Sequence, residues 1–177
     1  MKKQGHVNCK CEICENGLES FQRKEAEMLE RVGHTIRYVV DEYDCDLTGS
    51  TYPSIYTYGL LQNYKHVELE CVLPIDQQSA MFLLNTLAAK VKEGVSFETY
   101  EVYQIPELNN VPFYFIPSVQ YGSETPVLRV ILADANNKLP NDDGCHPIYA
   151  IQEYIGENQV SDLIEEFWLR DGAVVQQ

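Results

Sequence analysis

The sequence predicts a single α+β domain with a mostly antiparallel sheet of about five to six strands. Patterns typical of helices and strands interleave along the chain without regular βαβ units, which favours antiparallel pairing. Three segments carry helical patterns, one near each end and one in the middle. At 177 residues the chain is long enough for one well-buried core and short for two domains.

The N-terminal helix is predicted from about Asn16, where apolar residues begin to recur at helical spacing. Gly33 stands where a helix commonly ends in a left-handed cap. The apolar stripe consists of Leu18, Phe21, Met28, Leu29 and Val32. A short strand over Ile36–Val40 follows, and then an acidic loop over residues 41–46.

Two further strands are predicted over Ser54–Leu61 and Val67–Leu73, before a central helix. In the second strand apolar residues alternate with Glu68 and Glu70, so one face is apolar and the other charged. Asp76 is a good N-cap for the central helix, which spans about residues 76–93. Its buried stripe consists of Met81, Leu84, Leu87, Ala88 and Val91.

The C-terminal half is predicted to supply the remaining strands and a C-terminal helix that Ser161 can cap. Val127–Ala133 is almost wholly apolar, as in a central strand covered on both faces, and residues 134–147 have the composition of a loop. The other strands are Phe97–Ile105 and Phe113–Val119. Because no segment has linker composition, we expect one domain over residues 16–177, preceded by a Cys-rich segment over residues 1–15.

Four motifs occur in a fixed order through the body of the chain. They are Gly33-His34-Thr35-Ile36, Tyr56-Thr57-Tyr58-Gly59-Leu60, His66-Val67-Glu68-Leu69 with Leu84-Asn85 downstream, and Ala133–Pro140. Their order and spacing resemble the domain of unknown function 4262 family, over roughly residues 30–147. Val67 and Leu139 depart from the proline and tryptophan of the family pattern. The resemblance implies a bacterial or phage cytoplasmic protein, in a family without an assigned activity.

The chain shows neither the apolar leader of a signal peptide nor an apolar run long enough to span a membrane. We therefore expect a cytoplasmic protein without a membrane partner. In that reducing compartment, clustered cysteines are more often metal ligands or redox groups than structural disulfides.

A structural zinc site is predicted near the N-terminus, from Cys9, Cys11 and Cys14. Zinc binds thiolates and imidazoles tetrahedrally, and structural sites usually have four protein ligands. The candidates for the fourth ligand are Cys145, His146, Cys45 and His6. We favour Cys145 or His146, because a distant ligand would tie the N-terminal segment to the body. The same thiols, beside a lysine, also allow redox exchange.

A second candidate site centres on His66 and Glu68, which are two positions apart on a strand and share its charged face. Such a pair can orient an imidazole for acid–base chemistry or bind a metal ion. Tyr56 and Tyr58, with the threonine between them, bring hydroxyl groups to the preceding strand. The alternative is a surface pair that caps the turn at residues 63–65.

The charge distribution bears on the partner. Residues 1–40 have a net charge of +1, and the remainder has −15. Such a field repels phosphate backbones, which argues against nucleic-acid binding by the main body and suits a basic protein partner. No phosphate-binding loop, zinc-protease helix or nucleophile elbow is present. We expect a protein-binding or immunity/defence-type module. A hydrolase-like enzyme using His66 and Glu68, and a thiol redox sensor, are the alternatives.

Overall fold

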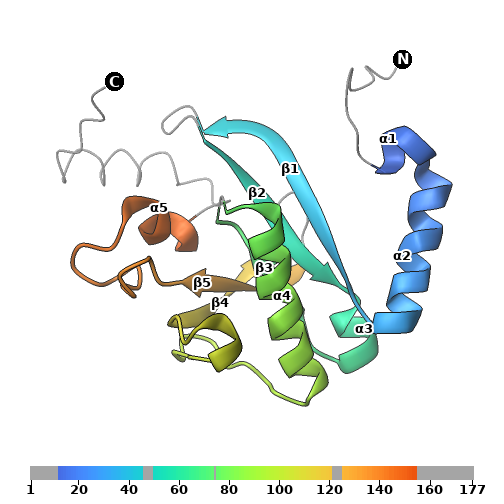
Figure 1. Cartoon of the computed structure of the whole chain (residues 1–177). Helices are drawn as coiled ribbons and strands as arrows, with labels where there is room; N and C mark the ends of the chain where they lie inside the picture. Colours follow the sequence, from blue (N-terminus) through green and yellow to red (C-terminus); the bar gives the residue numbers. More distant parts are fainter. Residues whose placement is uncertain (1–11, 46–49, 74, 121–124, 155–177) are drawn as a thin grey trace.

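The centre of the fold is a five-stranded sheet with the strand order β1-β2-β3-β5-β4 (Figure 1). The structure is a computed structural model that describes residues 12–45, 50–73, 75–120 and 125–154. The strands are β1 (Thr35–Cys45), β2 (Ser50–Tyr58), β3 (Glu68–Cys71), β4 (Phe113–Val119) and β5 (Pro126–Leu132). All neighbouring pairs are antiparallel except β3 and β5, which run parallel. The predicted α+β class with a mostly antiparallel sheet is confirmed.

The helices differ greatly in how closely they pack on this sheet. They are α1 (Glu12–Asn16), α2 (Leu18–Val32), α3 (Leu60–Tyr64), α4 (Gln77–Lys92) and α5 (Pro147–Ala150), with 3₁₀ turns η1 (Pro106–Leu108) and η2 (Ile151–Glu153). Figure 1 shows α4 lying across one face of the sheet, whereas α2, which precedes β1, lies to one side of the sheet. The predicted helix from Ser161 lies outside the described residues.

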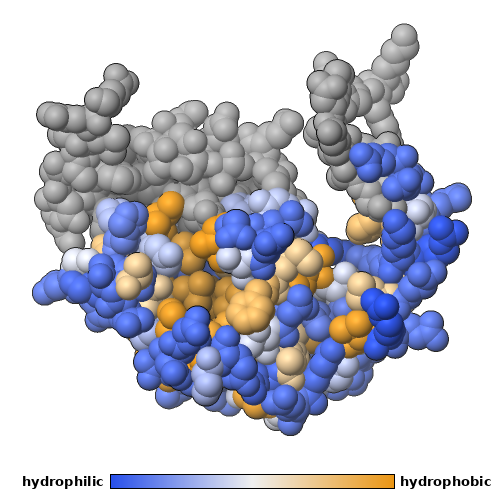
Figure 2. Space-filling model, in the orientation of Figure 1, coloured by the Kyte–Doolittle hydropathy of each residue, from blue (hydrophilic) through white to orange (hydrophobic). Residues whose placement is uncertain are grey.

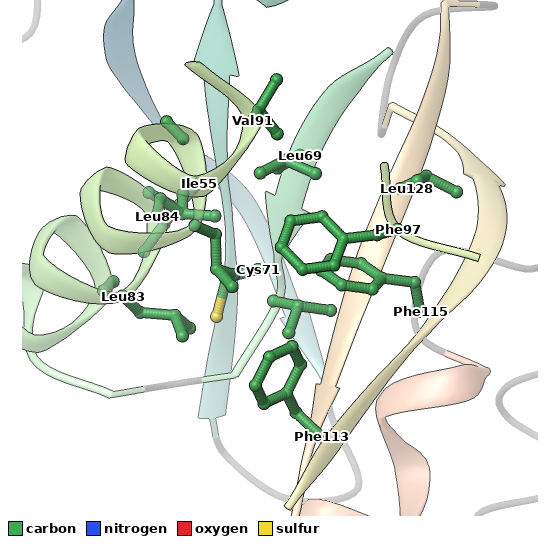
Figure 3. Close-up of a cluster of buried hydrophobic side chains, with 14 of the residues drawn as sticks. Ile55, Leu69, Cys71, Leu83, Leu84, Val91, Phe97, Phe113, Phe115 and Leu128 are labelled. Carbon is green, nitrogen blue, oxygen red and sulfur yellow. The ribbon is translucent and has the colours of Figure 1, made fainter. Parts of the chain in front are cut away.

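The main core forms between α4 and the sheet. The predicted N-cap is confirmed, because the Asp76 carboxylate accepts a hydrogen bond from Ser79 N at 3.0 Å. The buried side of α4 comprises Ala80, Leu83, Leu84, Leu87, Ala88 and Val91. Figure 3 shows this side facing Ile55, Leu69 and Cys71, with Phe97, Phe113, Phe115 and Leu128 beyond them. Each fully buried large apolar side chain contributes about 1.5–3 kcal/mol, so this layer holds the fold together.

Strand β1 extends further than its composition indicates. The acidic segment predicted as a loop continues the strand to Cys45, and pairing with β2 resumes at Asp44 after an irregularity that begins at Val40. Hydrogen bonding to a neighbouring strand outweighs the weak strand preference of acidic residues. Strand β2 ends earlier than predicted, at Tyr58, because Gly59 adopts φ +112° and starts α3.

The segment predicted as a strand over Phe97–Ile105 forms only two isolated bridges, Thr99 with Phe115 and Tyr103 with Phe113. Between them the backbone of Tyr100 turns into the left-handed region at φ +64°. That conformation interrupts an extended path, so the segment runs along β4 as a loop. β4 itself matches its predicted bounds.

Strand β3 joins two parts of the sheet through few residues. On one side it pairs with β2, where Ile55 lies opposite Cys71 and Tyr56 opposite Glu70. On the other side it pairs with β5, where Glu68 lies opposite Val127, Leu69 opposite Leu128 and Glu70 opposite Arg129. The polar side chains discussed next lie on and around this short strand.

Candidate functional site

Glu68, at the start of β3, caps the short helix α3. Its carboxylate accepts hydrogen bonds from the Thr57 hydroxyl at 2.7 Å and from the backbone N–H groups of Gly59, Leu60 and Leu61 at 2.9, 3.3 and 3.1 Å. The first N–H groups of a helix lack partners within the helix, and a carboxylate satisfies them well. Both oxygens of Glu68 are therefore engaged in holding the β2–α3 turn.

His66 lies beside this turn but does not pair with Glu68 among the described residues. Its Nδ1 donates a hydrogen bond to the carbonyl oxygen of Val67 at 2.7 Å, since a carbonyl can only accept. In the neutral ring this leaves the lone pair on Nε2. The imidazole is half-buried and packs edge-on to the Phe97 ring, with centroids 6.2 Å apart. The structure thus does not assemble the predicted His–carboxylate pair.

The two candidate tyrosines take part in a different contact. The Arg37 guanidinium lies 3.7 Å from the centroid of the exposed Tyr58 ring. It also forms a bidentate ion pair with Glu25 of α2, at 2.8 and 2.9 Å. The hydrogen bond to Glu25 is the main cause of a raised Arg37 pKa, and a hydrogen bond to buried Tyr56 adds to it. Arg37 of β1 therefore links α2 to the sheet through Glu25, and Tyr56 and Tyr58 of β2 hold the Arg37 side chain in place.

A buried ion pair on the same sheet is a feature that the sequence analysis did not foresee. Arg129 of β5 donates from Nε to the Glu70 carboxylate at 2.9 Å, and both side chains are almost fully buried. The second Glu70 oxygen accepts a hydrogen bond from the Ser54 hydroxyl at 2.7 Å. A single charge in an apolar strand requires a partner, so Arg129 was itself the signal.

Gln152 joins this network from the C-terminal side. Its amide oxygen accepts from Leu132 N at 2.9 Å, and its amide nitrogen donates to Leu132 O at 2.8 Å. The side chain thus imitates a neighbouring strand at the end of β5. Arg129 Nη1 reaches the Gln152 carbonyl at 3.4 Å. Together these bonds hold η2 against the sheet.

His34 forms another buried polar contact, at the end of α2. Its Nε2 donates to the Asn85 amide oxygen of α4 at 2.9 Å. Its Nδ1 is buried and has no hydrogen-bond partner among the described residues. Burial lowers the His34 pKa, the bond to Asn85 opposes this, Lys92 lowers it further and Glu68 raises it. The neutral imidazole is therefore the favoured form.

These contacts bring the first three sequence motifs together at one junction. Asn63 Nδ2 donates to the carbonyl of Gly33 at 2.8 Å. A Cβ atom at Gly59 would lie 3.0 Å from that same carbonyl oxygen and 3.3 Å from His34 Cα. The first motif thus packs directly on the second, Glu68 of the third caps the turn of the second, and Asn85 bonds to His34. Close packing, with its positive φ, accounts for the glycine at position 59.

The predicted zinc ligands are only partly within the described residues. Cys9 and Cys11 lie outside them, and of Cys14 only its place in α1 is described. Cys145 is buried, and its thiol donates to Lys138 O at 3.5 Å; burial, with Asp134 and Asp142 nearby, raises its pKa to about 11. His146 is exposed, and its Nδ1 accepts from Ile148 N at 3.3 Å.

The arrangement of these segments bears on the fourth ligand. Figure 1 shows α1, the helix that contains Cys14, and α5, the helix that follows Cys145 and His146 in the chain, on opposite sides of the molecule. Within the described ranges, no three His, Cys, Asp or Glu side chains gather as a metal site. Because two of the three N-terminal cysteines are outside those ranges, the zinc site stays a prediction.

Cys71 is buried in the main core. Burial raises the pKa of its thiol to about 12, which keeps it protonated. A protonated, inaccessible thiol is a poor nucleophile. Cys71 is therefore not a candidate for the redox alternative.

The fold and its polar contacts define a small α+β protein in which the buried side chains of Glu68, Glu70 and Arg129 hold strands and turns together. A family model described as "Domain of unknown function (DUF4262)" matches residues 28–146, about two thirds of the chain, and the chain belongs to this family. No curated protein and no solved structure matches the chain. In the described part of the chain, no helix has the length and hydrophobicity needed to cross a membrane.

Proposed function

We propose that this protein is a protein-binding or immunity/defence-type interaction module, in which the candidate residue Glu68 serves the scaffold. The observation that carries the proposal is the use of Glu68, whose carboxylate is occupied by the Thr57 hydroxyl and three backbone N–H groups. An acid–base catalyst needs a free proton-accepting position near its substrate. The buried Glu70 is likewise paired with Arg129.

The described surface supports binding rather than catalysis. Figure 2 shows hydrophobic residues near the middle of one face, over α4, within a mostly hydrophilic surface. Exposed large apolar side chains on α4 and in the loop after it include Met81, Phe82, Val95, Tyr100 and Val102. Apolar side chains within a strongly acidic body suit a partner that is basic around an apolar contact.

The zinc site belongs to the same proposal as a structural element. Three thiolates and a fourth protein ligand would leave no coordination position for a substrate. The N-terminal segment has few apolar residues, so a bound ion would offset the entropy lost on ordering it. Cys9, Cys11 and Cys14 remain the expected ligands, and the candidates for the fourth are Cys145, His146, Cys45 and His6.

One observation favours the enzymatic alternative. The bond from His66 Nδ1 to Val67 O leaves the lone pair of the neutral ring on Nε2, as a general base requires. A reaction based on His66 would have to recruit its second group from residues other than Glu68.

A pair of experiments tests the proposal. Cross-linked partners of the tagged full-length chain would be identified in its host cells and then purified for reconstitution. We expect a saturable complex of fixed stoichiometry, weakened by salt and unaffected by His66→Ala. Incubation with a host metabolite extract provides the opposing test. Turnover of a metabolite by the wild type and not by His66→Ala would overturn the binding-module proposal.

A further inference from the structure

The loop that follows α4 is anchored in the core by two aromatic side chains, Phe97 and Tyr103. The Phe97 ring lies against Phe115, with centroids 4.7 Å apart (Figure 3). The Tyr103 ring stacks on Phe113 at 5.7 Å and meets Phe97 edge-on at 5.3 Å. Phe97 is part of the core and Tyr103 packs against it, so the two ends of the segment over residues 98–102 are fixed.

Backbone hydrogen bonds also hold the segment between Phe97 and Tyr103. Tyr100 N donates to Phe115 O at 2.8 Å, and Tyr103 exchanges two bonds with Phe113 at 2.7 and 3.0 Å. Glu98 N donates to the Tyr103 hydroxyl at 2.7 Å. The loop is therefore bonded to β4 at Tyr100 and at Tyr103, and the bond from Glu98 to Tyr103 closes the loop on itself.

The tip of this loop presents large apolar side chains to solvent. Tyr100 is 67 % exposed and Val102 is 58 % exposed. Tyr100 also holds φ +64°, where a bulky residue is unfavourable and glycine or asparagine is usual. Tyrosine is one of the residue types enriched among those that dominate binding energy at protein interfaces, so an exposed tyrosine at this position suits a binding anchor.

The charged residues in the segment that forms the tip are of one sign. Glu98 and Glu101 flank Tyr100 and are exposed. Between residues 94 and 105 the sequence contains no lysine or arginine. An aromatic face beside two carboxylates suits a guanidinium or ammonium group, which the ring and the charges attract together.

We infer that the tip formed by Tyr100 and Val102, with Glu98 and Glu101 beside it, is the docking knob for a cationic segment of a protein partner. The segment carries an arginine or lysine next to an apolar side chain: the cation lies on the Tyr100 ring between the carboxylates, and the apolar side chain covers Val102. This inference rests on the proposed binding function and names its site and the chemistry of its partner.

A phage-displayed library of random peptides, panned against the immobilised full-length protein, provides the probe. We expect the selected peptides to contain arginine or lysine beside an apolar residue. Tyr100→Gly should weaken their binding at least tenfold, and Glu98→Gln with Glu101→Gln should weaken it severalfold and flatten its salt dependence. Tyr100→Phe, which keeps the ring, should retain binding.

Thermal unfolding separates this role from a structural one. Glycine relieves the positive φ at position 100, so Tyr100→Gly should leave the melting temperature unchanged or raise it by a few degrees. Asn109→Gly is the matched control, because Asn109 also has positive φ (+55°) in a neighbouring exposed turn. It should leave peptide binding unchanged.

Three outcomes overturn the inference: no peptide is selected, the selected peptides lack a cationic pattern, or they bind Tyr100→Gly as well as the wild type. A marked loss of stability in Tyr100→Gly also counts against it. None of these outcomes touches the broader proposal, because the reconstituted complex with a host partner does not presuppose this site.

Discussion

Arg129 and Glu70 meet side by side on parallel strands, with Nε and a carboxylate oxygen 2.9 Å apart and both side chains shielded from solvent. The pair lies where β3 meets β5. The Ser54 hydroxyl and the Gln152 carbonyl bind it from either side. It therefore links β2, β3, β5 and η2 through one set of charged groups.

Removing one member of this pair should destabilise the fold strongly. Arg129→Met leaves Glu70 buried and charged, which should cost about 3–5 kcal/mol in the free energy of unfolding. The double variant with Glu70→Leu should recover much of that loss, because no charge remains buried. Urea denaturation of both single variants and the double variant measures the coupling. Purely additive losses would contradict the pairing.

The cap on α3 predicts a smaller and more local effect. Glu68→Gln removes the charge that three N–H groups and the Thr57 hydroxyl bind, which should cost about 1.5–3 kcal/mol. Glu101→Gln, at an exposed position, is the control and should change stability by less than about 0.5 kcal/mol. Equal effects in the two variants, measured by urea denaturation, would exclude the cap.

His34 predicts a pH dependence of stability. Its pKa is lowered in the folded state, so above pH 6.5 both states are neutral and its contribution to stability is fully present. As pH falls below 6.5 the unfolded chain binds a proton first, and stability decreases until the folded pKa is passed. Nearby Lys92 opposes protonation and Glu68 favours it. His34→Gln should reduce the slope of unfolding free energy against pH between pH 7.5 and 5.5. An unchanged slope would contradict this.

The zinc prediction is tested on protein purified without added metal. We expect about one equivalent of zinc by elemental analysis, and a lower melting temperature after chelation, since binding free energy adds to folding free energy. Cys11→Ser should lose the ion, and Cys145→Ser should lose it only if Cys145 is the fourth ligand. Protein without zinc, whose N-terminal thiols all react freely, would rule the site out.

Local patterns carried the parts of the fold that depend on near neighbours. Asp76 and the apolar stripe behind it located α4, and the bounds of β4 followed from its own residues. The continuation of β1 to Cys45 depends on pairing with β2, and the acidic composition of that segment gives no sign of it.

The candidate site illustrates the same limit. The alternation around Glu68 placed it on a charged face, but its partners exist only once Gly59 turns the chain into α3. Arg129 is a single charged residue in an apolar strand, which indicates a buried charge, but its partner Glu70 is 59 residues away in the chain and cannot be identified from local pattern. The convergence of His34 with Asn85 likewise depends on how α2 and α4 approach each other.

The parallel pairing of β3 with β5 has a consequence for the order of folding. The hairpins β1–β2 and β4–β5 join strands that are close in sequence, so each can form early. The parallel register that joins them, Glu68–Val127 to Glu70–Arg129, must close a long stretch of chain that includes α4. Closing such a stretch is entropically costly and slow. We expect the Glu70–Arg129 contact to complete late, so that its loss accelerates unfolding far more than it slows refolding.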